Sequence, residues 1–118
     1  MYRLLHLNLL DAEFTSTSEH CTLTLVGQLT GQDIEPLRSA MAAWLAVVDA
    51  DVAVDVGELS FVSINGLGLL VWLAAQVQRR GHRLHLLHIG AHLCELLQLT
   101  RLDRVLAYDD TPCALMAA

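Results

Sequence analysis

The sequence predicts an α/β fold: a mixed β-sheet that opens with a hairpin, continues with parallel strands in βαβαβ order, and packs with about three to four helices. Two observations lead to this prediction. Apolar and polar residues alternate over residues 20–27, which is typical of a half-buried strand. Further along the chain, strand-like and helix-like runs take turns, and such alternation produces parallel strands joined by right-handed crossovers.

The first half of the chain contains the predicted hairpin and the first helix. The apolar run 4–10 is the expected partner of strand 20–27, and the polar segment 11–19 is the expected connection between them. Residues 32–48 show helical spacing, and Pro36 fits only the first helical turn, where its missing N–H costs nothing. The apolar positions of this helix are Ile34, Leu37, Met41, Leu45 and Val48.

The second half alternates strands with helices. The valine-rich run 51–56 is typical of a buried parallel strand, and a helix follows over about 66–80. Residues 83–90 predict another strand, residues 91–99 a short amphipathic helix, and residues 104–108 a last edge strand. The inward-facing residues of the short helix are Leu93, Leu96 and Leu97.

Composition and charge narrow the class of protein. The 118 residues suffice for one core, so we expect a single domain over residues 1–118. Apolar residues make up 54% of the chain and charged residues 17%, which excludes a disordered protein. The apolar runs are shorter than the roughly 20 residues of a spanning helix, and no signal peptide is recognisable, so we expect a cytoplasmic protein without membrane insertion.

Nucleic acid is a poor partner for this chain, because its net charge is −6 and a phosphate-backbone binder needs a basic face. The one small basic cluster is interpreted as the solvated C-terminal end of the helix 66–80, where positive charge also favours the helix dipole. This cluster consists of Arg79, Arg80, His82 and Arg83.

No metal or cofactor is expected, and the chain is not predicted to be an enzyme. Three cysteines, at positions 21, 94 and 113, are far apart and indicate neither a disulfide framework nor a zinc site. His82, His85 and His88 are spaced by three, which on a strand places His85 opposite the other two. The segment around Asn65 lacks the lysine of a phosphate-binding loop and the pattern of a nucleophile elbow.

The segment "FVSINGLGLLVWL", residues 61–73, is a strand-to-helix turn, a place where α/β proteins put phosphate loops, nucleophiles or partner-binding surfaces. We expect Asn65 to be the N-cap of the following helix, since its side-chain oxygen can accept from free N–H groups of the first turn. Gly66 allows a close approach of the backbone. Ile64 is either a buried strand-end residue or an exposed apolar side chain.

The helix after this turn has more apolar residues than one buried face requires. If Leu67, Leu70 and Val77 face the sheet, together with Val71 and Ala74, then one face remains apolar and outward, which is unusual for a solvated helix. This face contacts a partner or a second copy of the chain as a homodimer, or else a loop or the C-terminal tail covers it. Its residues are Leu69, Trp72 and Leu73.

Several segments resemble one known family. "VDVGELSFVSINGLGLL", residues 54–70, is similar to the signature of the STAS domain, typically "LDLSGVTFIDSSGLGVL": Asp55 matches the strand Asp, Phe61 the apolar residue before the turn, and residues 66–68 the GLG triplet. "LLQLTRLDRVLAYDD" looks like the family's "LELTGLDRLFPVYDD", with Arg101 where the family usually has Gly. The likeness covers nearly the whole chain in order.

The resemblance implies a bacterial regulator of transcription of the anti-sigma factor antagonist type, which binds a kinase-like anti-sigma factor and so releases a sigma factor. In that family a serine of the turn is phosphorylated, whereas here Ser63 stands at the Asp position and Ile64 and Asn65 stand at the hydroxyl positions. Ser63 or Ser60 is an alternative phosphosite. The implied partner-binding residues are Ser63, Ile64, Asn65, Gly66, Leu67, Gly68, Leu69 and Trp72.

Two other functions stay open from the sequence. STAS relatives of a second kind are accessory subunits of ABC-type lipid transporters. With the usual phosphosite replaced, the chain is also compatible with a divergent scaffold that is not phosphorylated. A third alternative is a sensor of a small ligand or nucleotide, because helix N-termini attract phosphates.

Overall fold

The structure is a computed structural model that describes residues 2–17, 21–101 and 107–108. Its strands form one six-stranded sheet in the order β1-β2-β3-β4-β5-β6. The first three strands pair antiparallel and the remaining pairs are parallel, which confirms the predicted mixed sheet. The strands are β1 (Tyr2–His6), β2 (Leu10–Ser16), β3 (Cys21–Leu29), β4 (Val52–Val62), β5 (Leu84–Leu87) and β6 (Ala107–Tyr108).

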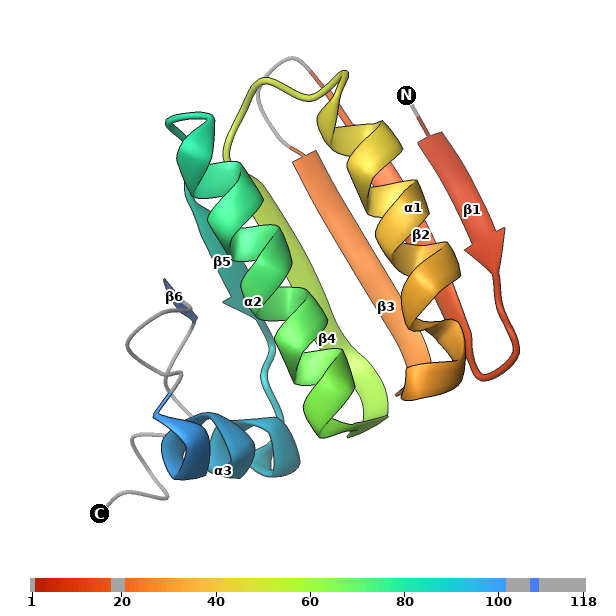
Figure 1. Ribbon diagram of the computed structural model, residues 1–118, viewed down its shortest axis with the longest axis vertical. Helices are drawn as coiled ribbons and strands as arrows, with labels where there is room; N and C mark the ends of the chain where they lie inside the picture. Colours follow the sequence, from red (N-terminus) through yellow and green to blue (C-terminus); the bar gives the residue numbers. More distant parts are fainter. Residues whose placement is uncertain (1, 18–20, 102–106, 109–118) are drawn as a thin grey trace.

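Three α-helices connect the parallel strands: α1 (Ile34–Leu45), α2 (Ile64–Arg79) and α3 (Ala91–Thr100), with a short 3₁₀ turn (Gly31–Asp33) before α1. Helices α1 and α2 run side by side over the same face of the sheet, and α3 lies near the start of α2 (Figure 1). Right-handed crossovers between sequential parallel strands produce this arrangement. The core lies between the sheet and these helices, and its largest fully buried side chains include Phe14, Leu23, Met41, Leu70 and Leu86.

Strand β2 was not predicted from the sequence. The segment 11–19, expected as a polar connection, is mostly strand, and the expected strand 4–10 is divided into β1 and a turn. Ala12 and Phe14 of β2 are buried under the helix layer, while the alternating polar residues Asp11, Glu13 and Thr15 lie on the opposite sheet face, which no helix of the described residues covers. A strand with one solvated face can carry half polar residues, so its composition resembles that of a loop.

The turn between β1 and β2 is held by a buried carboxylate. Asp33 is fully buried just before α1, and its two carboxylate oxygens accept the backbone N–H groups of Asn8 at 3.2 Å and Leu9 at 2.9 Å. The turn also depends on Gly27 in β3, whose φ of +114° suits glycine and whose Cβ would lie 2.3 Å from the carbonyl oxygen of Leu9. Both contacts join residues distant in sequence, so sequence spacing did not reveal them.

Several element boundaries differ from the prediction. Strand β4 extends to Val62 instead of ending near residue 56, and α1 ends at Leu45 instead of near residue 48. Helix α3 matches the prediction closely, with Leu93 and Leu97 buried and Leu96 half-buried. The expected strand 104–108 is seen as β6, and the rest of that segment lies outside the described residues. Cys21 is a free thiol, but Cys94 is disulfide-bonded, which sequence spacing had not indicated.

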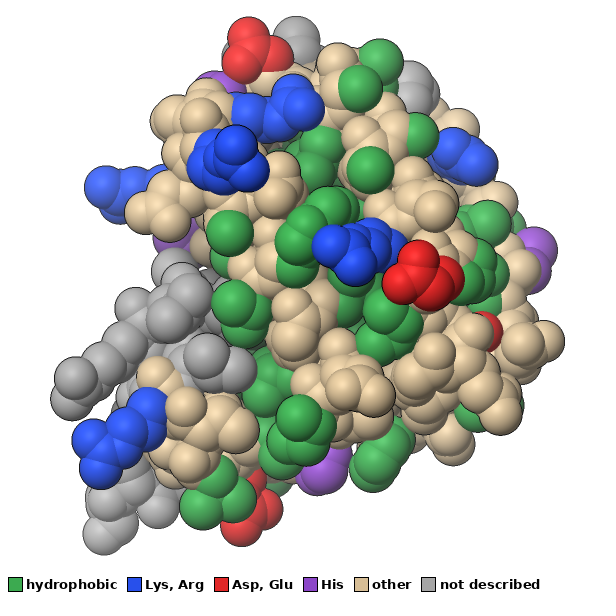
Figure 2. Space-filling model, in the orientation of Figure 1, with side chains coloured by type: hydrophobic (Ala, Val, Ile, Leu, Met, Phe, Trp, Pro, Cys, Tyr) green, Lys and Arg blue, Asp and Glu red, His purple; other side chains and the backbone are tan. Residues whose placement is uncertain are grey.

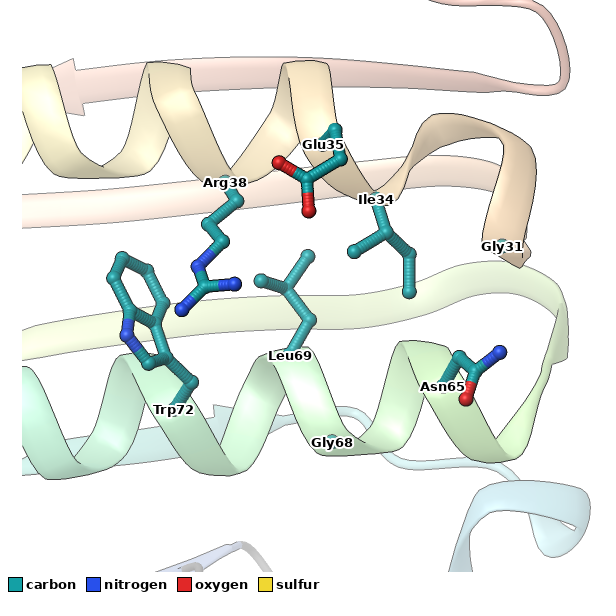
Figure 3. Close-up of a pocket in the computed structure, with 8 residues that line it drawn as sticks. All are labelled: Gly31, Ile34, Glu35, Arg38, Asn65, Gly68, Leu69 and Trp72. Atoms are coloured by element: carbon teal, nitrogen blue, oxygen red, sulfur yellow. The ribbon is translucent and has the colours of Figure 1, made fainter.

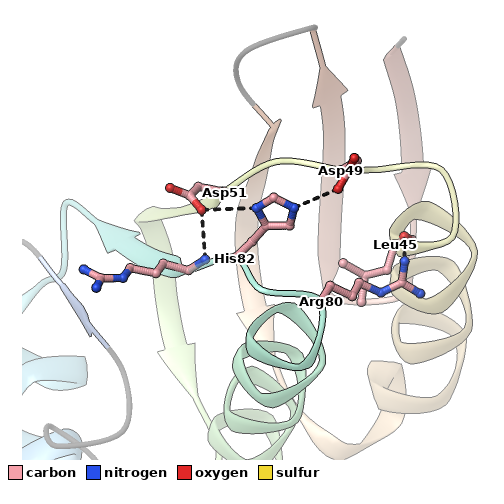
Figure 4. A network of polar contacts seen from close by, with 6 residues as sticks. Leu45, Asp49, Asp51, Arg80 and His82 are labelled. Atoms are coloured by element: carbon pink, nitrogen blue, oxygen red, sulfur yellow. Dashed lines mark hydrogen bonds and ion pairs between the residues drawn. The ribbon is translucent and has the colours of Figure 1, made fainter.

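The C-terminal ends of α1 and α2 are joined by polar contacts, and we call this the far end of the helix layer (Figure 4). The Arg80 guanidinium donates to the carbonyl oxygen of Leu45 at 2.6 Å. His82 lies between two carboxylates, with its Nε2 2.8 Å from Asp49 and its Nδ1 3.6 Å from Asp51. Two residues of the basic cluster predicted at this helix end, Arg80 and His82, therefore contact neighbouring elements with their side chains and are not only solvated.

Candidate functional site

The turn between β4 and α2 is capped by Ser63, so the prediction that Asn65 is the N-cap is wrong. Ser63 has extended backbone angles, and its hydroxyl oxygen accepts the N–H of Gly66 at 3.0 Å. The helix begins at Ile64, two residues earlier than expected, which places the hydroxyl of Ser63 opposite the free N–H groups of the first turn. Serine and asparagine are equally good caps, so the sequence could not distinguish them without the strand's end point.

The start of α2 is attached to the neighbouring strand β3. The N–H of Ser63 donates to the carbonyl oxygen of Leu29 at 2.9 Å. A Cβ at Gly66 would lie 2.7 Å from Cγ and 2.8 Å from the carbonyl oxygen of Leu29, closer than any side chain tolerates. Glycine is required at this position because helix and strand backbones touch, as the sequence analysis expected of Gly66.

The exposed side chains at this end form what we call the tip: Phe61, Ile64, Asn65 and His92. Ile64 is 63% exposed, which resolves the two alternatives for this residue in favour of an exposed apolar side chain. Phe61 is 43% exposed and its ring stacks on that of His92 at 5.4 Å between centroids. The tip therefore exposes two apolar side chains, Ile64 and Phe61, beside the polar Asn65 and His92, at the end of the helix layer where α1 and α2 both begin (Figure 1).

The predicted outward face of α2 is only partly outward. Leu69 and Leu73 are 4% and 0% exposed, so their expected position on the outer side is wrong. Helix α2 packs on the sheet and also against α1, and the second contact widens its buried stripe beyond the positions that face the sheet. Trp72 is half-buried at the edge of that contact.

A groove of about 410 Å³ lies between α1 and α2 and continues from the tip along both helices (Figure 3). From α1, Arg38 extends toward Trp72 of α2, and its guanidinium carbon lies 5.0 Å from the centroid of the Trp72 ring. On this side of the molecule, apolar side chains gather between the two helices and at the lower end (Figure 2). The lining residues are Gly31, Ile34, Glu35, Arg38, Asn65, Gly68, Leu69 and Trp72.

The structure thus divides the predicted site residues into two groups. One group is exposed or half-buried and consists of Ser63, Ile64, Asn65, Gly68 and Trp72. The other group is buried in the core and consists of Gly66, Leu67 and Leu69. Sequence reasoning missed the contribution of α1, because Arg38 is distant in sequence from Trp72 and reaches it only when the two helices pack in parallel. Helical periodicity of α1 alone indicated its buried face and gave no signal for its exposed residues.

The other hydroxyl, thiol and imidazole groups of interest lie apart from the groove. Ser60, the alternative phosphosite, is exposed and donates its hydroxyl to the carbonyl oxygen of Gly27 at 3.1 Å. Burial raises the pKa of the Cys21 thiol, which makes it a weak nucleophile. His88 is 3.1 Å from Asp55 through its Nδ1. Over residues 2–17, 21–101 and 107–108, no three metal-ligating side chains gather.

A comparison with family models decides the family of the chain. Residues 12–108 match the model described as "Mlab, STAS domain". The chain belongs to the STAS domain family. A search of curated protein sequences returned no match. Of the helices in the described part of the chain, none is long and apolar enough to cross a membrane.

Solved STAS structures share the fold of this chain. An anti-sigma factor antagonist from Mycobacterium paratuberculosis has a TM-score of 0.74 at 17% identity, with 92% of this chain and 92% of that chain covered. A STAS domain protein from Planctomyces limnophilus has a TM-score of 0.71 at 18% identity, with 90% and 96% covered. The antagonist SpoIIAA in its unphosphorylated form has a TM-score of 0.69 at 18% identity, with 98% and 93% covered.

Proposed function

We propose that this STAS protein is a regulatory interaction domain that binds an anti-sigma factor in the cytoplasm and thereby releases a sigma factor. The surface that docks is the turn 63–68 and the start of α2. The observation that supports this most directly is the 63% exposure of Ile64 on a turn whose backbone is fixed by Ser63 and Gly66. Phe61, at 43% exposure, adds apolar surface at the same end, and exposed apolar side chains that gather in one place mark protein-binding sites, whereas single ones do not.

We propose further that docking is not switched by phosphorylation at the usual position. The two hydroxyl positions of the family's turn are occupied by Ile64 and Asn65, and neither side chain accepts a phosphoryl group. The hydroxyl of Ser63 is bonded within the cap of α2. SpoIIAA, which shares the fold, has been solved in a phosphorylated form. A phosphate adds about −2 charge at pH 7, and a tip without an acceptor keeps its apolar surface permanently.

Two observations favour a second candidate, the accessory subunit of an ABC-type lipid transporter. A permanent apolar tip suits a constitutive subunit contact better than a reversible switch. The description of the matching family also names Mlab and no sigma regulator. In this case the same tip binds the transporter ATPase.

Binding measurements with purified partners separate the two candidates. The kinase-like anti-sigma factors and the ABC transporter ATPase subunits of the same organism are titrated by calorimetry with the wild-type protein and with Ile64→Asp. The leading proposal expects one anti-sigma factor to bind and the charged variant to lose that binding, with an unchanged unfolding curve since the side chain is exposed. Binding to the ATPase alone supports the second candidate, and binding to neither contradicts both.

Phosphorylation of a restored serine tests the missing switch. If the docking surface is retained, Ile64→Ser is expected to gain one phosphate from the partner kinase and ATP, and intact mass measures it. The wild-type protein is the control and is expected to stay unmodified at Ser63 and Ser60. A phosphate on the wild type at either serine would contradict the absence of a switch, and a bound kinase that ignores the restored serine would favour a scaffold role.

A further inference from the structure

We propose that the groove between α1 and α2 selects the partner, and that it takes an apolar side chain and a neighbouring carboxylate from a single acidic, amphipathic partner segment. This inference rests on the proposed function for the position of the docking surface. It extends that surface from the tip onto α1 and specifies the chemistry of what binds there.

The shape of the groove comes from a glycine in the middle of a helix. Gly68 is exposed, and a Cβ placed on it would meet no atom within 4 Å. Glycine in a helix interior costs roughly 1 kcal/mol relative to alanine, so this position is unfavourable for the helix itself. The missing side chain leaves a gap in the lining of a groove whose apolar lining residues include Ile34 and Leu69. An apolar side chain of a partner can fill this gap.

The cation of the groove is held in place and left unpaired. The Arg38 guanidinium lies over the ring of Trp72, at 5.0 Å from its centroid, a cation–π arrangement that restricts its position. None of the ion pairs found in the described residues involves Arg38. A guanidinium presents paired N–H donors that match a carboxylate. Arginine and tryptophan are also the residues most often found at the energetic centre of protein interfaces.

The helix ends add positive potential at the tip end of the groove, about one to two turns before Arg38 and Trp72. Helices α1 and α2 both begin at the tip end of the groove, and a helix N-terminus carries a partial positive charge. Helix α2 has no acidic residue in its first turn, whereas α1 has Glu35. Glu35 points toward the groove, but it lies beside the N-terminus of its own helix, which offsets its charge (Figure 3). The groove therefore favours an anionic group near Arg38, away from Glu35.

The test selects ligands from random sequences, so the partner does not have to be identified first. The purified protein is used to select binders from a displayed library of random short peptides, and the enriched peptides are synthesised and titrated. We expect enrichment of peptides with a large apolar residue close to Asp or Glu. Enrichment of basic or uncharged peptides, or of none, would overturn the proposal.

Groove variants identify where such a peptide binds. Gly68→Leu fills the gap and Arg38→Gln removes the cation, and each is expected to weaken the peptide about tenfold or more. Glu35→Gln removes a repulsion and is expected to strengthen binding about twofold to threefold. Ala43→Leu adds the same side chain at an exposed position of α1 outside the groove and is expected to change nothing. Gly68→Ala replaces Gly68→Leu if the larger substitution alters the unfolding curve.

The same variants separate this proposal from the proposed function. If an anti-sigma factor binds wild type, Gly68→Leu and Arg38→Gln equally, the groove does not select the partner and this inference fails while the proposed function stands. If acidic peptides bind in the groove and no anti-sigma factor binds, the proposed function fails and the groove proposal stands. Sedimentation that shows a dimer broken by Gly68→Leu would instead assign the groove to a second copy and overturn the acidic-segment proposal.

Discussion

The two ends of the helix layer differ in what they leave unsatisfied. At the far end, the polar groups engage one another: Arg80 bonds the last carbonyl of α1, and His82 lies between Asp49 and Asp51. At the tip end, Ser63 and the N–H of Gly66 are also hydrogen-bonded, but Ile64 and Phe61 remain 63% and 43% exposed. The far end also exposes Val47, at 65%, but its two helix ends are joined to each other by a hydrogen bond, whereas the tip has two exposed apolar side chains, Ile64 and Phe61, available to a partner.

This difference separates structural residues from contact residues within one short turn. Ser63 and Gly66 fix the start of α2 against β3, and neither is fully exposed. Ile64 and Asn65 lie between these two and project outward. Substitution of a contact residue on a fixed backbone is expected to change partner binding with little effect on the free energy of unfolding. Substitution of a structural residue is expected to lower the free energy of unfolding first.

The largest expected effect is on the structural side of the tip. Gly66→Ala places a Cβ within 2.7 Å of Leu29, so we expect a loss of about 2 to 3 kcal/mol in the free energy of unfolding. Gly68→Ala is the matched control: it lies in the same helix with open space around it and is expected to be neutral or to stabilise by up to about 1 kcal/mol. Urea unfolding followed by circular dichroism measures both, and equal effects of the two variants would contradict the close approach at Gly66.

A smaller effect is expected at the far end. Arg80→Ala removes the 2.6 Å hydrogen bond to the carbonyl oxygen of Leu45, and we expect a loss of about 1 kcal/mol, since the group is partly solvated. Arg79→Ala removes a neighbouring charge with no contact of this kind and is expected to stay within about 0.5 kcal/mol of wild type. The same unfolding measurement applies. If Arg79→Ala lowers the free energy of unfolding as much as Arg80→Ala does, then the interaction of positive charge with the helix dipole explains the stability contribution of Arg80 better than its hydrogen bond to Leu45.

The smallest effect is expected at the end of α3, which unlike α2 ends in strain. Arg101 has a φ of +60°, the left-handed conformation in which the family usually has glycine. Arg101→Gly is expected to stabilise the protein by about 0.5 to 1 kcal/mol because glycine adopts this conformation freely. Arg101→Ala removes the same charge without relieving the strain and should give no gain. A gain with alanine equal to that with glycine would mean that charge, and not the backbone angle, matters here.

Most of the fold could be predicted from the sequence because helical and strand periods are local signals. The parallel half of the sheet and the three helices follow from such periods. Strand β2 was missed because its polar residues face the uncovered side of the sheet, and burial of Ala12 and Phe14 depends on α1, which lies far along the chain. The expected single domain over residues 1–118 stays a prediction.

The sequence predicted where the candidate site lies, but it did not predict which side chains form its surface. The turn was recognised from its family signature, and Ile64 is exposed there. Leu69 was assigned outward because its environment depends on contact with α1, which no pattern within α2 reveals. Arg38 was missed for the same reason, since its partner Trp72 is brought near it only by helix packing.

The attachment of Ser63 and Gly66 to Leu29 has a consequence for binding thermodynamics and for evolution. A loop that is already ordered loses little conformational freedom when it is captured, so more of the contact energy is retained as affinity. The side chains that project from it are not needed for folding. Substitutions at residues 64, 65 and 68 can therefore redirect such a protein to a new binding partner while its scaffold remains intact.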